Sequence, residues 1–152
     1  MDSARAIEHL IFGYADRIDA GDFAGVADLL ADADVGAIGQ PGAVRGRDAV
    51  LALFAATTRR YPDGTPGTKH VTTNVRVDVD DVAGTAEAYS YFAVLQAVPG
   101  LPLQPVAAGR YHDHFQRRGD TWSFAARRFA VDLVGDVSHH LLGSPPAPTT
   151  HR

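Results

Sequence analysis

Three carboxylates lie close together in one short stretch near the start of the chain, FGYADRIDAGD. At about 100° per residue, Asp16 falls opposite the apolar stripe of the helix that this stretch predicts, and so faces solvent. Asp22 follows a helix-stopping glycine and caps a second helix. Asp19 is left on the flank of the stripe in the last turn, where the helix dipole disfavours a negative charge. A partly buried Asp19 therefore needs a partner, whereas an Asp19 exposed at a frayed helix end needs none.

A histidine and an asparagine occur in a strand-like run in the middle of the chain, KHVTTNV. Side chains alternate along a strand, so His70, Thr72 and Asn74 share one face and the valines share the other. If helices cover the His70 face, a neutral imidazole in a mainly apolar cavity can act as a general base, with Asp19 to orient it. If the valines form the core, His70 is solvated. The alternation fits both arrangements.

Two adjacent arginines, Arg127 and Arg128, occur in the last strand-like run and must point to opposite faces. One of them is expected to face away from solvent. An inward arginine can stabilise an anion or a developing oxyanion, although a surface ion pair is the commoner use of an isolated arginine. We take Arg127 as the candidate. Tyr14, within the apolar stripe of the first helix, is a further polar candidate.

The run GRYHDHF divides its polar residues between two faces. Tyr111 and Asp113 share one face, and Arg110, His112 and His114 share the other. Two histidines and an arginine in register are typical of an exposed or interfacial face. The two histidines could bind a metal together with a carboxylate, but no third ligand is spaced to complete the site. The sequence therefore predicts no metal site.

Other catalytic motifs are missing from the chain. It contains no phosphate-binding glycine loop, no G-x-S-x-G elbow and no H-E-x-x-H. His139 and His140, just before the end, are weak candidates. The remaining set suits cofactor-independent proton transfer better than redox or phosphoryl chemistry, and its members are Tyr14, Asp19, His70, Asn74, Tyr111 and Arg127.

Length and composition limit the class of protein. A chain of 152 residues is enough for one domain with a hydrophobic core, and shares of 45% hydrophobic and 21% charged residues are typical of soluble globular proteins. The absence of cysteine excludes disulfides and thiolate chemistry. A net charge of −4 disfavours nucleic acid, and no stretch predicts a membrane span or a signal peptide. We expect a cytoplasmic protein without a nucleic-acid or membrane partner.

Two kinds of element must position the candidate residues. The first half predicts a helix over residues 3–20, a second helix capped by Asp22, short strands within residues 33–39 and 43–46, and a third helix from Asp48 to near Tyr61. The second half predicts an antiparallel meander of four strands over residues 68–80, 85–96, 105–118 and 121–133, with a Pro/Gly-rich loop at residues 98–105.

Helices first and long strands after predict an α+β domain with helices on one face of a curved sheet. We expect this single domain to span residues 1–142, followed by a flexible tail at residues 143–152. Apolar residues on both faces of the sheet predict that its outer face is covered in a homodimer or homotrimer.

Four stretches in this order resemble the SnoaL-like families of the nuclear-transport-factor-like cone fold: YADRIDAGD, KHVTTN, AGRYHDHF and WSFAARR. The resemblance covers nearly the whole chain and is closest to the branch of scytalone dehydratase, bile-acid 7α-dehydratase and lindane dehydrochlorinase. It implies a cone-shaped α+β barrel whose curved, mostly antiparallel sheet wraps around the N-terminal helices. Small hydrophobic substrates and no cofactor are implied as well.

The resemblance also implies roles for single residues. The Asp–His pair of that branch falls on Asp19 and His70, with His70 as the general base and Asp19 holding its tautomer. The helix tyrosine of the dehydratases falls on Tyr14, and the H-x-x-x-N spacing of the dehydrochlorinase falls on Asn74; both are expected to bind substrate. The closing-strand arginine falls on Arg127, which is expected to steady negative charge.

The sequence departs from that branch at three points. Ala93 or Val94 stands where the bile-acid enzyme has a second catalytic aspartate, and Val131 stands where it has an arginine. The second histidine of scytalone dehydratase has no clear counterpart. The chemistry implied is that of a dehydratase or other lyase, an isomerase or a cyclase, acting on a polyketide, steroid or terpenoid-like molecule. A non-catalytic binding or oligomerisation module, and an epoxide hydrolase or epoxide-opening cyclase, are the alternatives.

Overall fold

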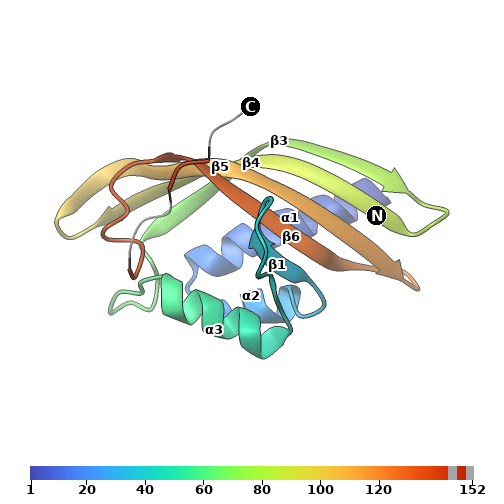
Figure 1. The fold of residues 1–152 in the computed structure, drawn as a ribbon, viewed down its shortest axis with the longest axis horizontal. Helices are drawn as coiled ribbons and strands as arrows, with labels where there is room; N and C mark the ends of the chain where they lie inside the picture. Colours follow the sequence, from blue (N-terminus) through green and yellow to red (C-terminus); the bar gives the residue numbers. More distant parts are fainter. Residues whose placement is uncertain (144–146, 150–152) are drawn as a thin grey trace.

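The protein consists of a curved sheet that arches over three helices in the computed structural model, which describes residues 1–143 and 147–149 (Figure 1). This arrangement confirms the predicted cone-like α+β fold. In chain order the elements are α1 (Ser3–Asp19), α2 (Phe23–Leu29), β1 (Asp34–Ala37), β2 (Val44–Arg45), α3 (Arg47–Thr57), β3 (Thr68–Asp80), β4 (Thr85–Val98), β5 (Leu101–Arg118) and β6 (Thr121–Val134).

The sheet is mixed and open. Its strand order is β2-β1-β6-β5-β4-β3, and β3 to β6 form the predicted antiparallel meander. The short β1 lies parallel to β6, while β2 pairs antiparallel with β1. The long strands curve over α1, α2 and α3, so the concave face is covered by helices and the opposite face is not (Figure 1).

Helix α1 forms as its apolar spacing predicts. The Asp2 side chain caps it by accepting a hydrogen bond from the backbone N–H of Arg5. Its stripe, which includes Ile7 and Ile11, is buried against the rest of the core. Gly21 follows the helix with a φ of +72°, and a Cβ there would collide with the Gly64 carbonyl, so only glycine fits this turn. The tight turn leaves Asp19 as the last residue of α1.

Helix α3 ends at Thr57, four residues before the predicted end at Tyr61. Thr58 is extended and forms a β-bridge with Leu141. The backbone N–H of Arg59 then donates to the carbonyl of His140. The C-terminal segment therefore competes with the helix for the backbone groups of Thr58 and Arg59. The apolar spacing of the helix contains no sign of this long-range pairing.

The predicted loop at residues 98–105 is mostly strand. β4 continues to Val98 and β5 already begins at Leu101, leaving a tight turn between them. Pro102 and Pro105 are tolerated there because β6 first pairs with β5 at Ala107, so one side of this part of β5 is an edge. The prolines predicted a loop, because proline is rare inside a sheet. At a sheet edge, however, a strand tolerates proline.

Strand β3 contains a β-bulge that changes which of its side chains face the helices. The register shifts between Thr73 and Arg76, and Asn74 takes a left-handed φ of +54°, which asparagine tolerates better than most residues. Before the bulge, His70 faces α1. After it, Val75 and the following alternate valines pack against the core. Each of the two interpretations of this strand is therefore right for one half of it.

The outer face of the sheet retains exposed apolar side chains, including Val71, Tyr91 and Leu133. A homodimer or homotrimer that covers this face stays a prediction. The predicted tail lies partly outside the described residues, which omit 144–146 and 150–152; within it, the backbone N–H of Thr149 donates to the carbonyl of Val131. In the described part of the chain, every helix is too short or too polar to cross a membrane.

Candidate active site

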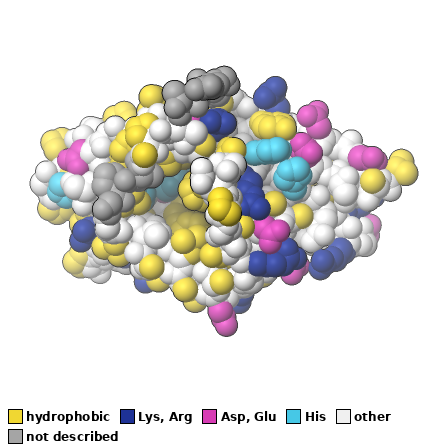
Figure 2. Space-filling view, viewed as in Figure 1, with side chains coloured by type: hydrophobic (Ala, Val, Ile, Leu, Met, Phe, Trp, Pro, Cys, Tyr) yellow, Lys and Arg dark blue, Asp and Glu magenta, His cyan; other side chains and the backbone are white. Residues whose placement is uncertain are grey.

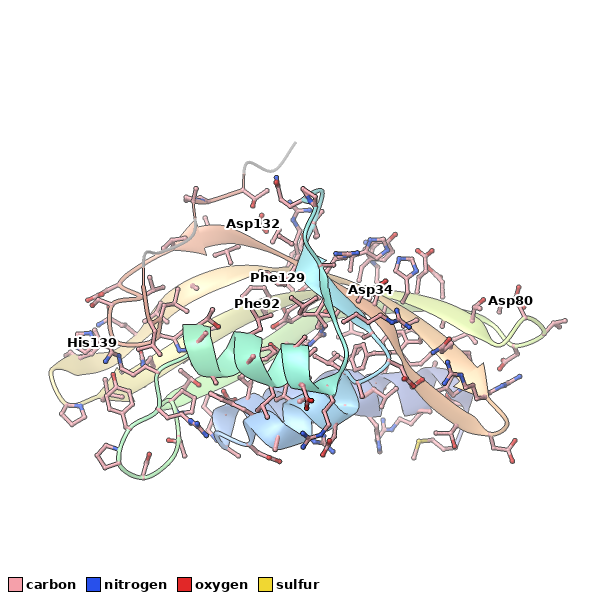
Figure 3. The ribbon with its side chains drawn as sticks, turned by 60° about the horizontal axis from the view of Figure 1, so that its bottom comes forward. Asp34, Asp80, Phe92, Phe129, Asp132 and His139 are labelled. Atoms are coloured by element: carbon pink, nitrogen blue, oxygen red, sulfur yellow. The ribbon has the colours of Figure 1, made fainter. Side chains whose placement is uncertain are left out.

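A cavity of about 340 Å³ lies between α1, α3 and the concave face of the sheet. Figure 2 shows the molecule hollowed on this side, with hydrophobic side chains in the hollow. In Figure 3, Phe92 and Phe129 lie on their strands toward α3. The apolar side chains that line the cavity include Phe54, Phe92, Val94, Phe129, Val131 and Leu141.

The wall of the cavity near α1 holds the predicted Asp19 and His70 side by side. Asp19 Oδ1 lies 2.6 Å from His70 Nδ1, and the two side chains are only 11% and 8% exposed. His70 lines the cavity, whereas Asp19 stands behind it. The imidazole Nε2 has no hydrogen-bond partner among the described residues. A proton on Nδ1, donated to Asp19, therefore leaves the Nε2 lone pair for the cavity.

Asp19 is held by three groups of β3. Besides the imidazole, the backbone N–H of His70 donates to Oδ2 over 2.8 Å and the Thr68 hydroxyl donates to Oδ1 over 2.8 Å. Burial by itself raises the pKa of Asp19, but the hydrogen bonds and charge of His70, with the Thr68 bond, outweigh burial and lower the pKa overall. Asp19 thus stays ionised and fixes the orientation of the imidazole ring.

A second buried acid–base pair, formed by Arg127 and Asp113, lies near the first. Arg127 of β6 and Asp113 of β5 are cross-strand neighbours, 2% and 0% exposed. The guanidinium Nε and Nη2 donate to the two carboxylate oxygens, each over 2.8 Å. Burial lowers the pKa of Arg127, but the charge and bonds of Asp113 outweigh it and raise the pKa above its usual value. This arginine therefore carries a permanent positive charge at the cavity wall.

Two tyrosines enclose the arginine. The guanidinium carbon of Arg127 lies 3.8 Å from the ring centre of Tyr111 and 4.3 Å from that of Tyr14. The ring centres of the two tyrosines are 5.9 Å apart in an edge-to-face arrangement. Burial raises the pKa of Tyr14 and raises that of Tyr111 well above its usual value. Both phenols therefore stay protonated and can donate hydrogen bonds.

One nitrogen of the arginine is left over. The Nη1 of Arg127 is buried and has no hydrogen-bond partner among the described residues. Leaving such a donor unpaired in the interior is costly, and Arg127 lines the cavity. An oxygen atom of a bound molecule would satisfy this donor. The residue thus combines fixed charge with an N–H that has no hydrogen-bond partner among the described residues, a combination that suits a developing oxyanion.

A second histidine, which the sequence analysis ranked as weak, also lines the cavity. The His140 ring centre lies 6.2 Å from that of His70. Burial lowers the pKa of His140 to about 4, with nearby His70 contributing to the shift, so its imidazole is neutral at neutral pH. Its Nδ1 is buried without a hydrogen-bond partner among the described residues. His140 therefore offers the cavity a neutral polar group.

The structure brings five of the six candidate residues together, while Asn74 lies elsewhere. Asn74 is exposed and does not line this cavity. Its expected place on the His70 face is wrong because the β-bulge adds one residue and turns the asparagine outward. The intact H-x-x-x-N spacing could not reveal the bulge.

The candidate set from the sequence omits Asp113, and it includes His140 only as a weak candidate. For Asp113 a signal existed, since strand alternation placed it on the same face as Tyr111 and a buried aspartate needs a cation nearby. For His140 no local pattern was available, because it follows the last strand in an irregular segment.

The comparisons with known proteins agree with this architecture. The family model of the SnoaL-like domain matches residues 1–128. No curated protein matches the sequence significantly.

Three similar solved structures share the fold. A scytalone dehydratase-like protein of Novosphingobium aromaticivorans is 21% identical over 98% of this chain and 93% of its own, with a TM-score of 0.71. LinA is 20% identical over 97% of this chain and 95% of its own, with a TM-score of 0.67. ActVI-ORFA of Streptomyces coelicolor is 18% identical over 85% of this chain and 96% of its own, with a TM-score of 0.65. At these identities the likeness establishes the fold alone.

Proposed function

The chain belongs to the SnoaL-like domain family, and from this premise we propose that it is a cofactor-independent acid/base enzyme that uses Asp19 and His70 on a small hydrophobic substrate. The observation that carries the proposal is the 2.6 Å contact between Asp19 Oδ1 and His70 Nδ1 at the wall of an apolar cavity. The reaction class is that of a dehydratase or other lyase, an isomerase or a cyclase.

His70 is the proposed general base. With its Nδ1–H bound to Asp19, its Nε2 takes a proton from a carbon next to a carbonyl group, and the electrons of that C–H bond move toward the carbonyl oxygen. Asp19 stabilises the imidazolium that forms. Returning the proton to a leaving hydroxyl releases water, whereas returning it to another carbon isomerises the substrate.

Arg127 is the proposed oxyanion group. Its Nη1, free of protein hydrogen bonds within the described residues, suits the oxygen on which negative charge develops. The hydroxyls of Tyr14 and Tyr111 are further donors, and the neutral His140 can hydrogen-bond a substrate hydroxyl.

The substrate class follows from the size and polarity of the cavity. A volume of about 340 Å³ with mostly apolar walls suits a compact ring compound of the polyketide, steroid or terpenoid kind. The polar groups near the dyad and the arginine suit one carbonyl and one hydroxyl group on that compound.

A direct test measures proton abstraction without knowledge of the natural substrate. The protein is incubated in D₂O with a series of small cyclic ketones, including 2-tetralone, and deuterium uptake next to the carbonyl is followed by mass spectrometry. We expect His70→Gln to slow catalysed exchange by about 10²–10⁴-fold, the usual contribution of a general base. His9→Gln, which changes an exposed histidine of α1, is the matched control.

Two results would contradict the proposal. Exchange by His70→Gln at the wild-type rate would remove the dyad from the mechanism. Tight binding of the ketones in the cavity, with no exchange by the wild-type protein above the buffer rate, would favour a binding module instead.

A further inference from the structure

The outer face of the sheet carries a cluster of possible metal ligands, which we call the outer cluster: Glu87 of β4 with His112 and His114 of β5. In the β4–β5 register Glu87 is the direct partner of His114, and Tyr89 is that of His112. All three side chains stand on the face away from the cavity. Figure 2 shows histidine and acidic side chains next to one another at the surface.

The cluster has the spacing of a coordination site. His112 Nε2 lies 3.3 Å from Glu87 Oε2, and His114 Nδ1 lies 3.6 Å from Glu87 Oε1. One ligand atom from each of the three residues can be chosen so that all lie within 4.8 Å of one another. Two ligands bound to one tetrahedral Zn²⁺ at about 2.0–2.1 Å are about 3.3–3.4 Å apart. Only small side-chain rotations therefore separate this arrangement from a bound state.

We propose that the outer cluster binds Zn²⁺, with the two imidazoles and the carboxylate as protein ligands and water in the remaining position. Imidazole with carboxylate is a ligand set that suits zinc, and cysteine is not needed for it. The site is separate from the cavity and does not depend on the proposed reaction.

Neighbouring groups hold the ligands in place. The Tyr89 ring stacks on His112 with ring centres 4.3 Å apart, and the Tyr89 hydroxyl donates to Glu87 Oε2 over 3.2 Å. Such outer contacts orient metal ligands and strengthen binding.

Charges on the flanking strands act in opposite senses. Asp78 of β3 is the register partner of Glu87 and adds negative charge on one side. Arg128 of β6 is the register partner of His112 and adds positive charge on the other. Arg76 of β3 adds a further positive charge, since its guanidinium carbon lies 5.4 Å from the centre of the Tyr89 ring.

The sequence pointed to the two histidines but not to the site. No third ligand is spaced near His112 and His114 along the chain, which is why no metal site was predicted. Glu87 is 27 residues away from His114 in sequence (114 − 87) and is brought opposite it by the strand pairing. Strand register therefore supplies the ligand that local spacing lacked.

The test is a titration of the purified full chain with Zn²⁺ at pH 7.5 by calorimetry, with Co²⁺ absorption as a second readout of tetrahedral coordination. We expect one Zn²⁺ per chain. His114→Ala and Glu87→Gln are each expected to weaken binding by about tenfold or more, because outer contacts alone are worth about 10–100-fold. His9→Ala is the matched control and keeps wild-type affinity. Lowering the pH to 5 releases the metal, because protonated imidazoles cannot bind it.

Three outcomes would overturn the proposal. They are no saturable binding by the wild type, unchanged binding in both outer-cluster variants, and loss of binding in His70→Gln, which would locate the metal in the cavity. The side chains of Glu87 and His114 are half-exposed, so circular dichroism is expected to show the wild-type fold for both outer-cluster variants.

Discussion

Two buried acid–base pairs face the same cavity, and they differ in whether the cationic partner can lose its proton. Asp113 and Arg127 are held together on adjacent strands, with a bidentate contact over 2.8 Å. Asp19 and His70 come from α1 and β3 and meet over 2.6 Å. Arginine stays charged at all accessible pH values, whereas histidine gains and loses its proton near neutral pH. Similar geometry thus provides a fixed charge in one pair and, in the other, a residue able to carry a proton.

The comparison also explains the neighbours of each pair. Arg127 contacts the rings of Tyr14 and Tyr111, which suits a permanent cation. His70 instead faces the neutral His140 and is anchored from behind by Asp19. The wall with the fixed charge is suited to stabilise an anion, and the wall with the dyad is suited to move a proton.

The largest expected effect comes from removing one carboxylate at a time. Asp113→Ala leaves a buried arginine without its counter-ion and is expected to lower the free energy of unfolding by about 3–5 kcal/mol. Asp19→Ala leaves no permanent charge without a counter-ion, so the expected cost is only that of the lost hydrogen bonds, about 1–3 kcal/mol. Urea unfolding followed by circular dichroism at pH 7 measures both. Equal losses would mean that the two pairs do not differ as argued.

The next largest expected effect is a change of folding stability with pH, which comes from His140 beside His70. The pKa of His140 is about 4 in the folded protein, below the 6.5 of a free histidine. The unfolded chain therefore binds more protons between these values, so this residue makes the protein less stable as pH falls from 6.5 to 4, by up to about 3 kcal/mol. His70 and Asp19 are the titratable groups that the shift of His140 involves.

The variant His140→Gln isolates that contribution. We expect it to lose less unfolding free energy than the wild type between pH 7.5 and 4.5, because glutamine does not titrate. Urea unfolding at the two pH values gives the difference. An identical loss in wild type and variant would show that His140 is not held neutral by burial.

The smallest expected effect tests how firmly Asp19 is anchored. Thr68→Val removes the hydroxyl that donates to Asp19 over 2.8 Å while keeping the shape of the side chain. We expect a loss of about 1–2 kcal/mol in the free energy of unfolding. Thr73→Val, at an exposed position on the same strand, is the control and is expected to stay within about 0.5 kcal/mol of wild type. A larger loss at Thr73 than at Thr68 would contradict the anchoring role.

Much of the fold could be predicted from local patterns. The apolar spacing in the first helix predicted both its extent and the different environments of its carboxylates, with Asp16 exposed and the Asp19 side chain largely buried. Strand alternation placed Tyr111 inward and His112 outward, as the structure has them. The end of α3 was predicted too late because Thr58 pairs with Leu141, a contact between distant parts of the chain.

The site could be predicted only in part, because it also depends on contacts between distant parts of the chain. Which face of β3 is covered depends on a bulge at Asn74 that alternation cannot show, since both halves of the strand read as regular. His140 reaches the cavity through backbone bonds of the C-terminal segment to the end of α3, which have no sequence pattern.

The sequence by itself determined the types of element, the faces of most side chains and the short set of residues able to do acid/base chemistry. These features depend on spacing along one helix or one strand, which the backbone geometry fixes locally. The tertiary structure alone decided which of those residues meet. Asp19 and His70 are 51 residues apart in the chain, and their contact depends on how α1 packs on β3 and on the register before the bulge.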